Sequence, residues 1–426
     1  MTDHSCDILI SGGGIAGLTA AAVFGTAGFD VICVDPTPPV TEKDNAKADM
    51  RSTAMLQPAR GVLEDAGLWD QLALFASPLQ IMRIVDAGGP EPEARLTKEF
   101  NAADISDQPF GWNFPNWLLR RELVARLNAL ARVDFRPGTA TTSLFTRERE
   151  ARVRLSDGSR VSAKFVVAAD GRNSAMREAA GIGVSTTRYG QKALAFTVTH
   201  PIPHDNVSTE IHRTGGPFTL VPLPDFDGMP ASAIVWMDDG PLAQQRMELD
   251  KDDFEAAMSE RSCYLFGPLT LTSHRTIWPI ISQKADRLSA ERVALIAEAA
   301  HVVPPIGAQG LNMSLADTAK LLELAQAQPD ALGSRDMLDA YHKARHNDVA
   351  LRVQGIDLLN RASQMSAPAL RDARAMGLNA LYSLAPVRST LMQMGLGVKS
   401  PYPAPETIAP ASPLHHRVFR ARKAPS

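Results

Sequence analysis

The stretch DILISGGGIAGLTAAAVFGTAGFDVICVD, residues 7–35, decides how the beginning of this chain folds. A short apolar run leads into three glycines, a segment of small residues follows, and a second apolar run ends at Asp35. This succession predicts a strand, a helix and a second strand. Gly12, Gly14 and Gly17 satisfy the pattern G-x-G-x-x-G between the first strand and the helix, and in that context the pattern predicts a dinucleotide site.

Each residue type in this unit has a physical reason. Glycines permit the tight turn and let the backbone approach a pyrophosphate, while the first N–H groups of the helix, at Ile15 and Ala16, attract anions. Asp35 is placed to accept hydrogen bonds from a ribose. The glycines alone fit a plain strand-turn-helix equally well, but the strand, the helix and the acid together favour dinucleotide binding.

The composition of the 426 residues excludes several other classes of protein. Hydrophobic residues make up 45% and charged residues 21%, as in an ordinary packed protein. Lys and Arg number 44 against 47 Asp and Glu, which leaves no excess positive charge for nucleic acid. Three cysteines without a C-x-x-C pair and ten scattered histidines predict neither a disulfide framework nor a metal site.

The chain shows no membrane-spanning or secretory segment. No stretch approaches the roughly 18 consecutive apolar residues of a spanning helix, and the amino terminus has no apolar core of a signal peptide. We therefore expect a cytoplasmic protein, with peripheral contact at the inner face of the membrane left open. The proline-rich tail at residues 399–426 carries basic residues, which fits either an idle solvated tail or attraction to an anionic membrane or a protein partner.

Two later segments carry further chemistry. Residues 166–174, VVAADGRNS, predict a strand that ends in an Asp-Gly turn and an N-capped helix. Residues 297–312, AEAAHVVPPIGAQGLN, contain two prolines and two glycines, which predict a rigid loop and a helix start at Gly310. In a dinucleotide protein we expect this second helix start to face the far end of the cofactor, although a simple loop before a helix is the alternative.

The remaining pattern predicts an α/β protein in which the nucleotide domain is interrupted. Helical spacing covers residues 55–74, where Pro58 is expected to break the helix, and again residues 115–130. Alternating runs between residues 193 and 281 predict an antiparallel sheet. Strand character then resumes at residues 288–300, before the helix that starts at Gly310.

Together these elements resemble the flavin-dependent aromatic hydroxylases of the single-component, para-hydroxybenzoate-hydroxylase-like class, over most of residues 5–398. Within that class the likeness is to the ubiquinone-biosynthesis hydroxylases. Its specific part is AHVVPPIGAQGLN at residues 300–312; its other parts are Arg51, residues 56–69, NWLLR at residues 116–120 and a diffuse signature at residues 370–395.

The resemblance implies a Rossmann-like FAD-binding domain interrupted by a mostly antiparallel β-sheet substrate domain, with C-terminal helices. The FAD-binding domain is expected at residues 1–78, 106–180 and 282–335, the substrate domain at 79–105 and 181–281, and the C-terminal helical region at 336–398. It also implies that FAD is bound by Gly12, Gly14, Ile15, Ala16, Gly17, Asp35, Arg51, Arg120, Asp170, Gly171, Glu298, Pro305, Gly307, Gly310, Leu311 and Asn312. The substrate pocket is expected to include Tyr189, Gln191, Trp278 and Pro279, with ordinary strand positions and a buried structural tryptophan as the alternative.

Two positions qualify this reading. The family usually has Gly-Asp before Ala-Ala-His, whereas this chain has Ala297 and Glu298, so the carboxylate is kept but is a methylene longer. His301 invites a catalytic role, but a histidine in this position beside a cofactor is more typical of a packed, hydrogen-bonded residue. No catalytic residue is singled out.

Three functions are compatible with these motifs. The first is an NAD(P)H- and O2-consuming monooxygenase that hydroxylates a small aromatic, polyprenylated phenol on the path to ubiquinone, in contact with a membrane or a biosynthetic complex. The second is a related FAD hydroxylase of another aromatic small molecule. The third is a non-catalytic binding protein on the flavin fold. Because no second G-x-G-x-x-G occurs, we expect NAD(P)H to bind on the surface near the flavin.

Overall fold

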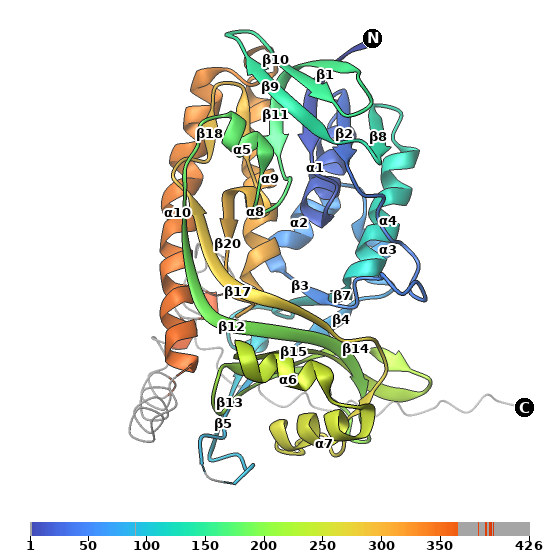
Figure 1. The fold of residues 1–426 in the computed structure, drawn as a ribbon, viewed down its shortest axis with the longest axis vertical. Helices are drawn as coiled ribbons and strands as arrows, with labels where there is room; N and C mark the ends of the chain where they lie inside the picture. Colours follow the sequence, from blue (N-terminus) through green and yellow to red (C-terminus); the bar gives the residue numbers. More distant parts are fainter. Residues whose placement is uncertain are drawn as a thin grey trace, which may run out of the picture.

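Three β-sheets and the helices packed against them form the fold of this computed structural model, which describes residues 2–89, 91–364, 382, 388, 389, 392, 393 and 395. The predicted tail at residues 399–426 and most of the helical region predicted beyond residue 364 lie outside the described residues. The fold is α/β, with a Rossmann-like part and a second, mostly antiparallel sheet (Figure 1). None of the helices in the described part is long and apolar enough to cross a bilayer.

The eight-stranded sheet contains the strand that precedes the glycines. Strand β1 (Asp3–Ser11) pairs in parallel with β2 (Val31–Asp35) on one side and β11 (Arg160–Ala168) on the other. Ile8, Leu9 and Ile10 are fully buried, since a parallel strand is covered on both faces. The sheet is completed by β8 (Val133–Pro137), β9 (Thr141–Thr146), β10 (Ala151–Leu155), β18 (Ser289–Ala290) and β19 (Val293–Leu295), and it packs against α1 (Ile15–Thr26) and α4 (Asn116–Ala129).

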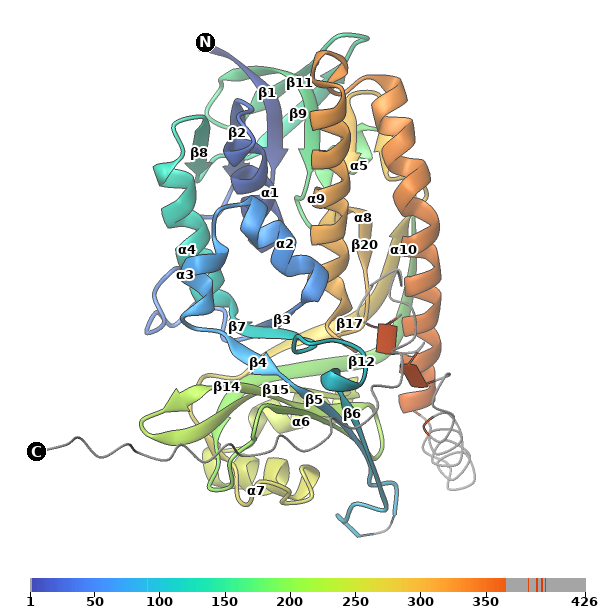
Figure 2. The same ribbon diagram turned by 180° about the vertical axis from the view of Figure 1, so that it is seen from behind.

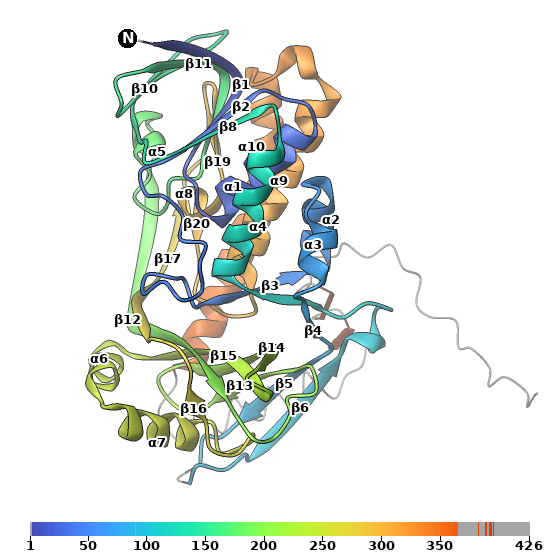
Figure 3. The ribbon, with the colours of Figure 1, turned by 90° about the vertical axis from the view of Figure 1, so that its right-hand side faces the viewer.

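The nine-stranded sheet forms the other half of the molecule. Its two long strands, β12 (Val184–Thr199) and β17 (Thr276–Ala285), run from this sheet up toward the first one (Figure 1). All of its pairings are antiparallel except that of β13 with β5. Helices α6 (Gly240–Glu248) and α7 (Lys251–Arg261) lie on its outer side (Figure 3). Its other strands are β5 (Ile81–Asp86), β6 (Leu96–Asn101), β13 (Val207–His212), β14 (Pro217–Phe226), β15 (Met229–Asp239), β16 (Thr270–Leu271) and β20 (His301–Val302).

The three-stranded sheet lies between the two larger ones (Figure 2) and corrects one prediction. Its strands are β3 (Ser52–Leu56), β4 (Ser77–Leu79) and β7 (Gly111–Pro115). The helix predicted at residues 55–74 is wrong at its start, because Met55 and Leu56 belong to β3. Helix α2 (Gln57–Asp65) begins only after them, and α3 (Trp69–Ala73) follows. Pro58 lies in the first turn of α2, where its missing N–H costs nothing, so it starts the helix instead of breaking it.

Two long helices complete the fold. Helix α9 (Gln309–Ala327) packs against α1 and α2, and α10 (Arg335–Ser363) extends along the molecule beside β12 and β17 (Figures 1 and 2). The hydroxyl of Tyr341 in α10 donates a hydrogen bond to the carbonyl of Leu295 at 2.7 Å. The short elements are α5 (Ala175–Ala179), α8 (Ala297–Ala300), and the 3-10 turns Ala102–Asp104 and Pro329–Ala331.

Candidate functional site

The glycine loop after β1 is pressed against the end of β11. Gly12 has φ +111°, and a Cβ added there would lie 2.3 Å from the carbonyl oxygen of Ala169. A Cβ at Gly17 would lie 1.9 Å from the carbonyl oxygen of Gly12. Only glycine fits at these two positions, so the loop is forced into a tight turn that passes directly beside the second motif.

The start of α1 leaves room and charge for an anion. A Cβ added at Gly14 would meet nothing within 4 Å, and α1 has neither a side-chain cap nor an acidic residue in its first turn. The first N–H groups, those of Ile15 and Ala16 among them, are therefore available at the positive end of the helix. Asp35 lies at the same loop, since its Oδ2 accepts a hydrogen bond from the N–H of Gly13 at 2.5 Å. The helix start fits the diphosphate of a dinucleotide, and the role of Asp35 at the ribose stays a prediction.

The second motif has its side chains committed to the helix that follows. Asp170 Oδ1 accepts a hydrogen bond from the Ser174 hydroxyl at 2.5 Å, and its Oδ2 accepts one from the N–H of Met176 at 3.1 Å. Ser174 in turn caps α5 by accepting from the N–H of Arg177. The local reading of an N-capped helix after an Asp-Gly turn is confirmed. What Asp170 and Gly171 can offer a cofactor is therefore their backbone, and that role stays a prediction.

The second and third motifs are joined by two arginines. Arg172 Nε donates to Glu298 Oε2 at 3.3 Å, and Arg177 Nη1 donates to the carbonyl of Ala299 at 2.9 Å. Ala297, where the resemblance implies glycine, has φ +56°. This left-handed conformation favours glycine, so the alanine is held in a strained backbone at the start of α8.

The proline-rich loop ends at an uncapped helix start. Ala308 precedes α9 in the left-handed conformation, and neither a side-chain cap nor an acid occupies the first turn of the helix. In the described part of the chain, a Cβ added at Gly310 would meet only a methyl of Val303 at 3.9 Å, and the first N–H groups of the helix receive no side-chain cap. The bend before this helix start is shaped by Pro305 and by Gly307, which has φ +64°. A second site for negative charge therefore opens at this end of the molecule.

Asn312 fastens this helix start to β3. Its Nδ2 donates to the carbonyls of Ala54 at 2.7 Å and Ala308 at 2.6 Å, and its Oδ1 accepts from the N–H of Leu56 at 2.8 Å. The resemblance implies that Asn312 contacts FAD, which its backbone N–H can do. The side chain has a different function, because it connects two elements more than 250 residues apart in the chain.

Arg51 and Arg120 share one buried carboxylate that the sequence did not reveal. Asp49 accepts from Arg51 Nε at 2.8 Å and Nη2 at 2.7 Å, and Arg120 Nη2 lies 3.2 Å from Asp49 Oδ2. Burial by itself would raise the pKa of Asp49, but the hydrogen bonds and charge of Arg51, helped by Arg120, hold that pKa below its ordinary value. The guanidinium of Arg51 also lies over the ring of Trp278, 5.4 Å from the centroid.

The four residues predicted for the substrate pocket divide between two places. Tyr189 and Trp278 pack with Ile306 of the proline-rich loop in one apolar cluster, whereas Gln191 and Pro279 line a basic pocket that adjoins this cluster at Ile280. Burial, followed by a hydrogen bond to Asp357, raises the pKa of Tyr189 to about 12, so its phenol stays protonated near neutral pH.

Gln191 is fixed by hydrogen bonds to its neighbours. Its Nε2 donates to the carbonyl of Gly215 at 2.6 Å, and its Oε1 accepts from Asn360 Nδ2 in α10 at 2.9 Å. Tyr189 makes a similar connection, because its hydroxyl donates to Asp357 Oδ1 in α10 at 2.6 Å. Both polar groups therefore tie β12 to α10.

His301 is packed and hydrogen-bonded, as expected for a residue without a catalytic role. Its side chain is fully buried, and its Nε2 lies 2.7 Å from Asp317 Oδ2. Asp317 also accepts from Arg345 Nε at 2.7 Å, and Arg345 Nη1 lies 2.7 Å from Asp348. The contact between Asp317 in α9 and Arg345 in α10 holds these two helices together. Within the described part of the chain, no group of three or more His, Cys, Asp or Glu residues is arranged to hold a metal ion.

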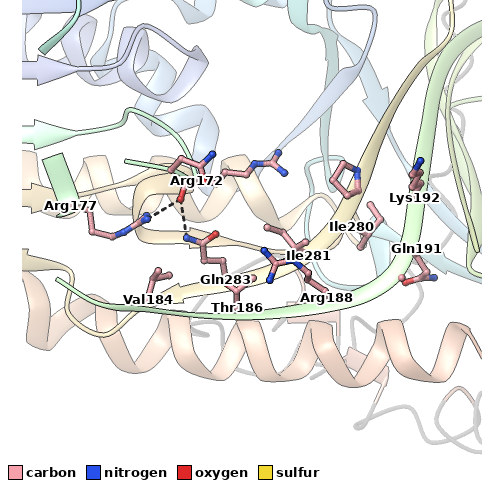
Figure 4. Close-up of a pocket in the computed structure, with 13 residues that line it drawn as sticks. Arg172, Arg177, Val184, Thr186, Arg188, Gln191, Lys192, Ile280, Ile281 and Gln283 are labelled. Carbon is pink, nitrogen blue, oxygen red and sulfur yellow. Dashed lines mark hydrogen bonds between the residues drawn. The ribbon is translucent and has the colours of Figure 1, made fainter. Parts of the chain in front are cut away.

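The basic pocket lies on the long strands beside the second motif (Figure 4). Its volume is about 500 Å³, and Arg172 and Arg177 line one end of it, with Arg188 and Lys192 along β12. The side chain of Gln283 in β17 closes the pocket against the turn, since its Nε2 donates to the carbonyl of Arg172 at 2.9 Å. The pocket therefore adjoins the cofactor motifs through residues 172–177.

Comparison with known proteins agrees with this geometry. Residues 5–355 match the family described as FAD binding domain. The chain is 31% identical over 415 residues to ubiquinone hydroxylase UbiL of Rhodospirillum rubrum, covering 97% of this chain and 94% of that protein. It is 25% identical to 3-demethoxyubiquinol 3-hydroxylase of Escherichia coli, covering 93% and 100%. The structure of p-nitrophenol 4-monooxygenase PnpA from Pseudomonas putida has a TM-score of 0.75 at 19% identity, covering 94% and 100%, which shows a likeness of fold.

Proposed function

Because this chain belongs to the family of FAD-dependent monooxygenases, we propose that it hydroxylates the aromatic ring of a polyprenylated phenol in ubiquinone biosynthesis. The observation that carries the proposal is the likeness to a ubiquinone hydroxylase over nearly the whole of both chains. In the balanced reaction, the ring C–H, O2, NAD(P)H and a proton give the ring C–OH, NAD(P)⁺ and water. FAD, when bound, supplies the activation of O2 and accepts the hydride.

The residues of this chain would hold and shape that chemistry. We propose that the loop at Gly12, Gly14 and Gly17 binds the diphosphate, with Asp35 at the ribose. The helix start at residues 310–312 would face the flavin ring, where its dipole stabilises negative charge by about 0.3–1 kcal/mol. Support comes from the direct contact between the motifs, since Gly12 abuts Ala169 and Arg177 reaches the carbonyl next to Glu298.

The remaining predicted residues support the cofactor from the sides. Arg51 and Arg120, oriented by Asp49, would neutralise the diphosphate and flank the flavin. Asp170, Gly171 and Glu298 would border the middle of the cofactor. The apolar cluster of Trp278, Tyr189 and Ile306 would exclude water from the place where the ring reacts.

A polyprenylated substrate is carried by a membrane, so we propose that the enzyme meets the membrane surface from the cytoplasmic side. Sedimentation with lipid vesicles tests this step. If the described part of the chain contacts the membrane, vesicle binding is expected to persist after residues 400–426 are removed. If the tail makes the contact, vesicle binding is expected to be lost.

The direct test of function uses the purified flavoprotein. Polyprenylated phenols are expected to stimulate NAD(P)H oxidation and O2 consumption, and to give a product one oxygen atom heavier. If a prenylated phenol causes only H2O2 formation and an unprenylated phenol is hydroxylated, the substrate is another aromatic molecule. In cells, a quinone profile of a strain that lacks this gene is expected to show an accumulated precursor that lacks one ring hydroxyl.

A further inference from the structure

We propose that the basic pocket on β12 and β17 binds the phosphate groups of the reduced nicotinamide dinucleotide, with Arg188 and Lys192 as its phosphate ligands. The inference rests on the proposed function, since only a reaction that consumes this reductant brings such a ligand to the protein. It goes further by assigning the ligand to residues of the long strands, outside the glycine loop that serves the flavin dinucleotide.

The two faces of the long strands differ in what covers them. Lys284 of β17 faces α10, where its Nζ lies 3.4 Å from His346 Nε2, whereas the neighbouring Gln283 faces the turn at Arg172. Arg188 of β12 is paired in register with Ile281, two residues from Gln283, so it lies on the same face as Gln283. Figure 4 shows Arg188 and Gln283 on the side of the strands turned away from α10. The pocket is therefore open on a face that α10 does not cover.

The pocket carries positive charge that no carboxylate within it neutralises. Four cations, Arg172, Arg177, Arg188 and Lys192, line it, and its lining contains neither Asp nor Glu. In the described part of the chain Arg188 has no ion pair and no side-chain hydrogen bond. Lys192 Nζ contacts only the neutral Oε1 of Gln244, at 2.9 Å.

The two cations at the other end are also incompletely paired. Within the part of the chain that the structure describes, Arg177 donates only to carbonyl oxygens, those of Ala299 and Arg172. Among the described residues, the one carboxylate contact of this group is that of Arg172 with Glu298 at 3.3 Å. A cluster of this kind attracts a multiply charged anion, because guanidinium and ammonium groups form strong charge-assisted hydrogen bonds with phosphate oxygens.

The position of the pocket favours the reducing dinucleotide over other anions. Arg172 connects the basic pocket with the predicted cofactor site, since it lines the pocket and contacts Glu298. A ligand whose phosphates lie on β12 could therefore extend toward the flavin. The volume of about 500 Å³ lies in the usual range for small-molecule sites. The sequence has no second G-x-G-x-x-G loop to bind the reductant elsewhere.

The test measures anaerobic flavin reduction in the FAD-loaded enzyme at increasing concentrations of NADH and NADPH. Arg188→Gln and Lys192→Gln are each expected to raise the half-saturating concentration about tenfold, equivalent to about 1.4 kcal/mol, and the double variant about a hundredfold. FAD content, the flavin absorption spectrum and reduction by dithionite are expected to stay unchanged. Arg154→Gln, which removes an exposed cation from β10, serves as the matched control and is expected to have no effect.

Other outcomes separate the site from the proposed function. An unchanged half-saturating concentration in the double variant overturns the site. A loss of binding to phosphatidylglycerol vesicles, with flavin reduction unchanged, assigns the cations to lipid phosphates and also overturns it. If neither nucleotide reduces the wild-type flavin, the proposed function fails. Calorimetric titration with NADP⁺ then tests the site independently. If the wild type binds NADP⁺ and the double variant does not, the site is supported. If both bind it equally, or neither binds it, the site is refuted.

Discussion

Replacing Ala297 with glycine tests whether the backbone at the start of α8 is strained. Ala297 has φ +56°, and the left-handed conformation costs a residue with a Cβ about 1–2 kcal/mol. Glycine avoids this cost but loses about 0.5–1 kcal/mol through the greater freedom of the unfolded chain. The difference predicts that Ala297→Gly raises the free energy of unfolding by up to about 1.5 kcal/mol.

Urea denaturation of the FAD-free protein measures this effect, with the midpoint expected to move upward at an unchanged slope. The matched control is Ala299→Gly, two residues further along the same short helix. Ala299 is buried and its φ is not positive, so this glycine is expected to lower stability by about 1 kcal/mol. If both variants lower the midpoint by similar amounts, the backbone at Ala297 is not strained and the reasoning fails.

Three further predictions concern the side chains around the site. Asp49→Asn is expected to lower the free energy of unfolding by about 1 kcal/mol at neutral pH, because it removes the carboxylate that Arg51 and Arg120 share, while the half-exposed Arg51 can still be hydrated. Since the pKa of Asp49 is lowered in the fold, its stabilisation is present above the ordinary pKa and is lost as the pH falls through the lowered value, so the variant and the wild type converge in acid. Tyr189→Phe is expected to leave the pH profile of activity unchanged up to about pH 10, because a phenol with a pKa of about 12 does not titrate there. Asn312→Ala is expected to cost about 2–3 kcal/mol, measured by denaturation, since three hydrogen bonds to α9 and β3 are lost.

Controls for these variants come from exposed positions of the same residue type. Asp65→Asn and Asn128→Ala change exposed residues of α2 and α4, and each is expected to alter stability by less than about 0.5 kcal/mol. A difference between Asp49→Asn and the wild type that persists unchanged in acid contradicts the assigned carboxylate. A pH profile that shifts in Tyr189→Phe contradicts the neutral phenol.

The local parts of the fold could be predicted from the sequence because their signals are local. Residues 7–35 form a strand, a loop, a helix and a second strand as predicted. The helix at residues 115–130 is found as α4. In each of these the apolar period and the turn residues lie within about 15 residues of each other, so the pattern itself fixes the element.

The parts that escaped prediction depend on partners far away in the chain. Met55 and Leu56 look helical because they precede a helical pattern, but pairing with Trp112 and Gly111 places them in a strand. Asp49 is one of several acids in a charged loop, and no local signal marks it as the residue that Arg51 will contact. Such choices are made by tertiary contacts that outweigh local propensity.

The cofactor site is held together by the protein itself, and this has a consequence for how FAD binds. Gly12 abuts Ala169, Arg177 reaches from α5 to the carbonyl of Ala299, and Asn312 connects α9 to β3. These contacts are made by groups of the protein itself, and they fix the two helix starts that would face FAD. We expect FAD binding to require little rearrangement of the backbone, so that most of the binding energy remains available as affinity. FAD is expected to raise the free energy of unfolding by an amount that increases with the logarithm of the FAD concentration, without a change in secondary structure.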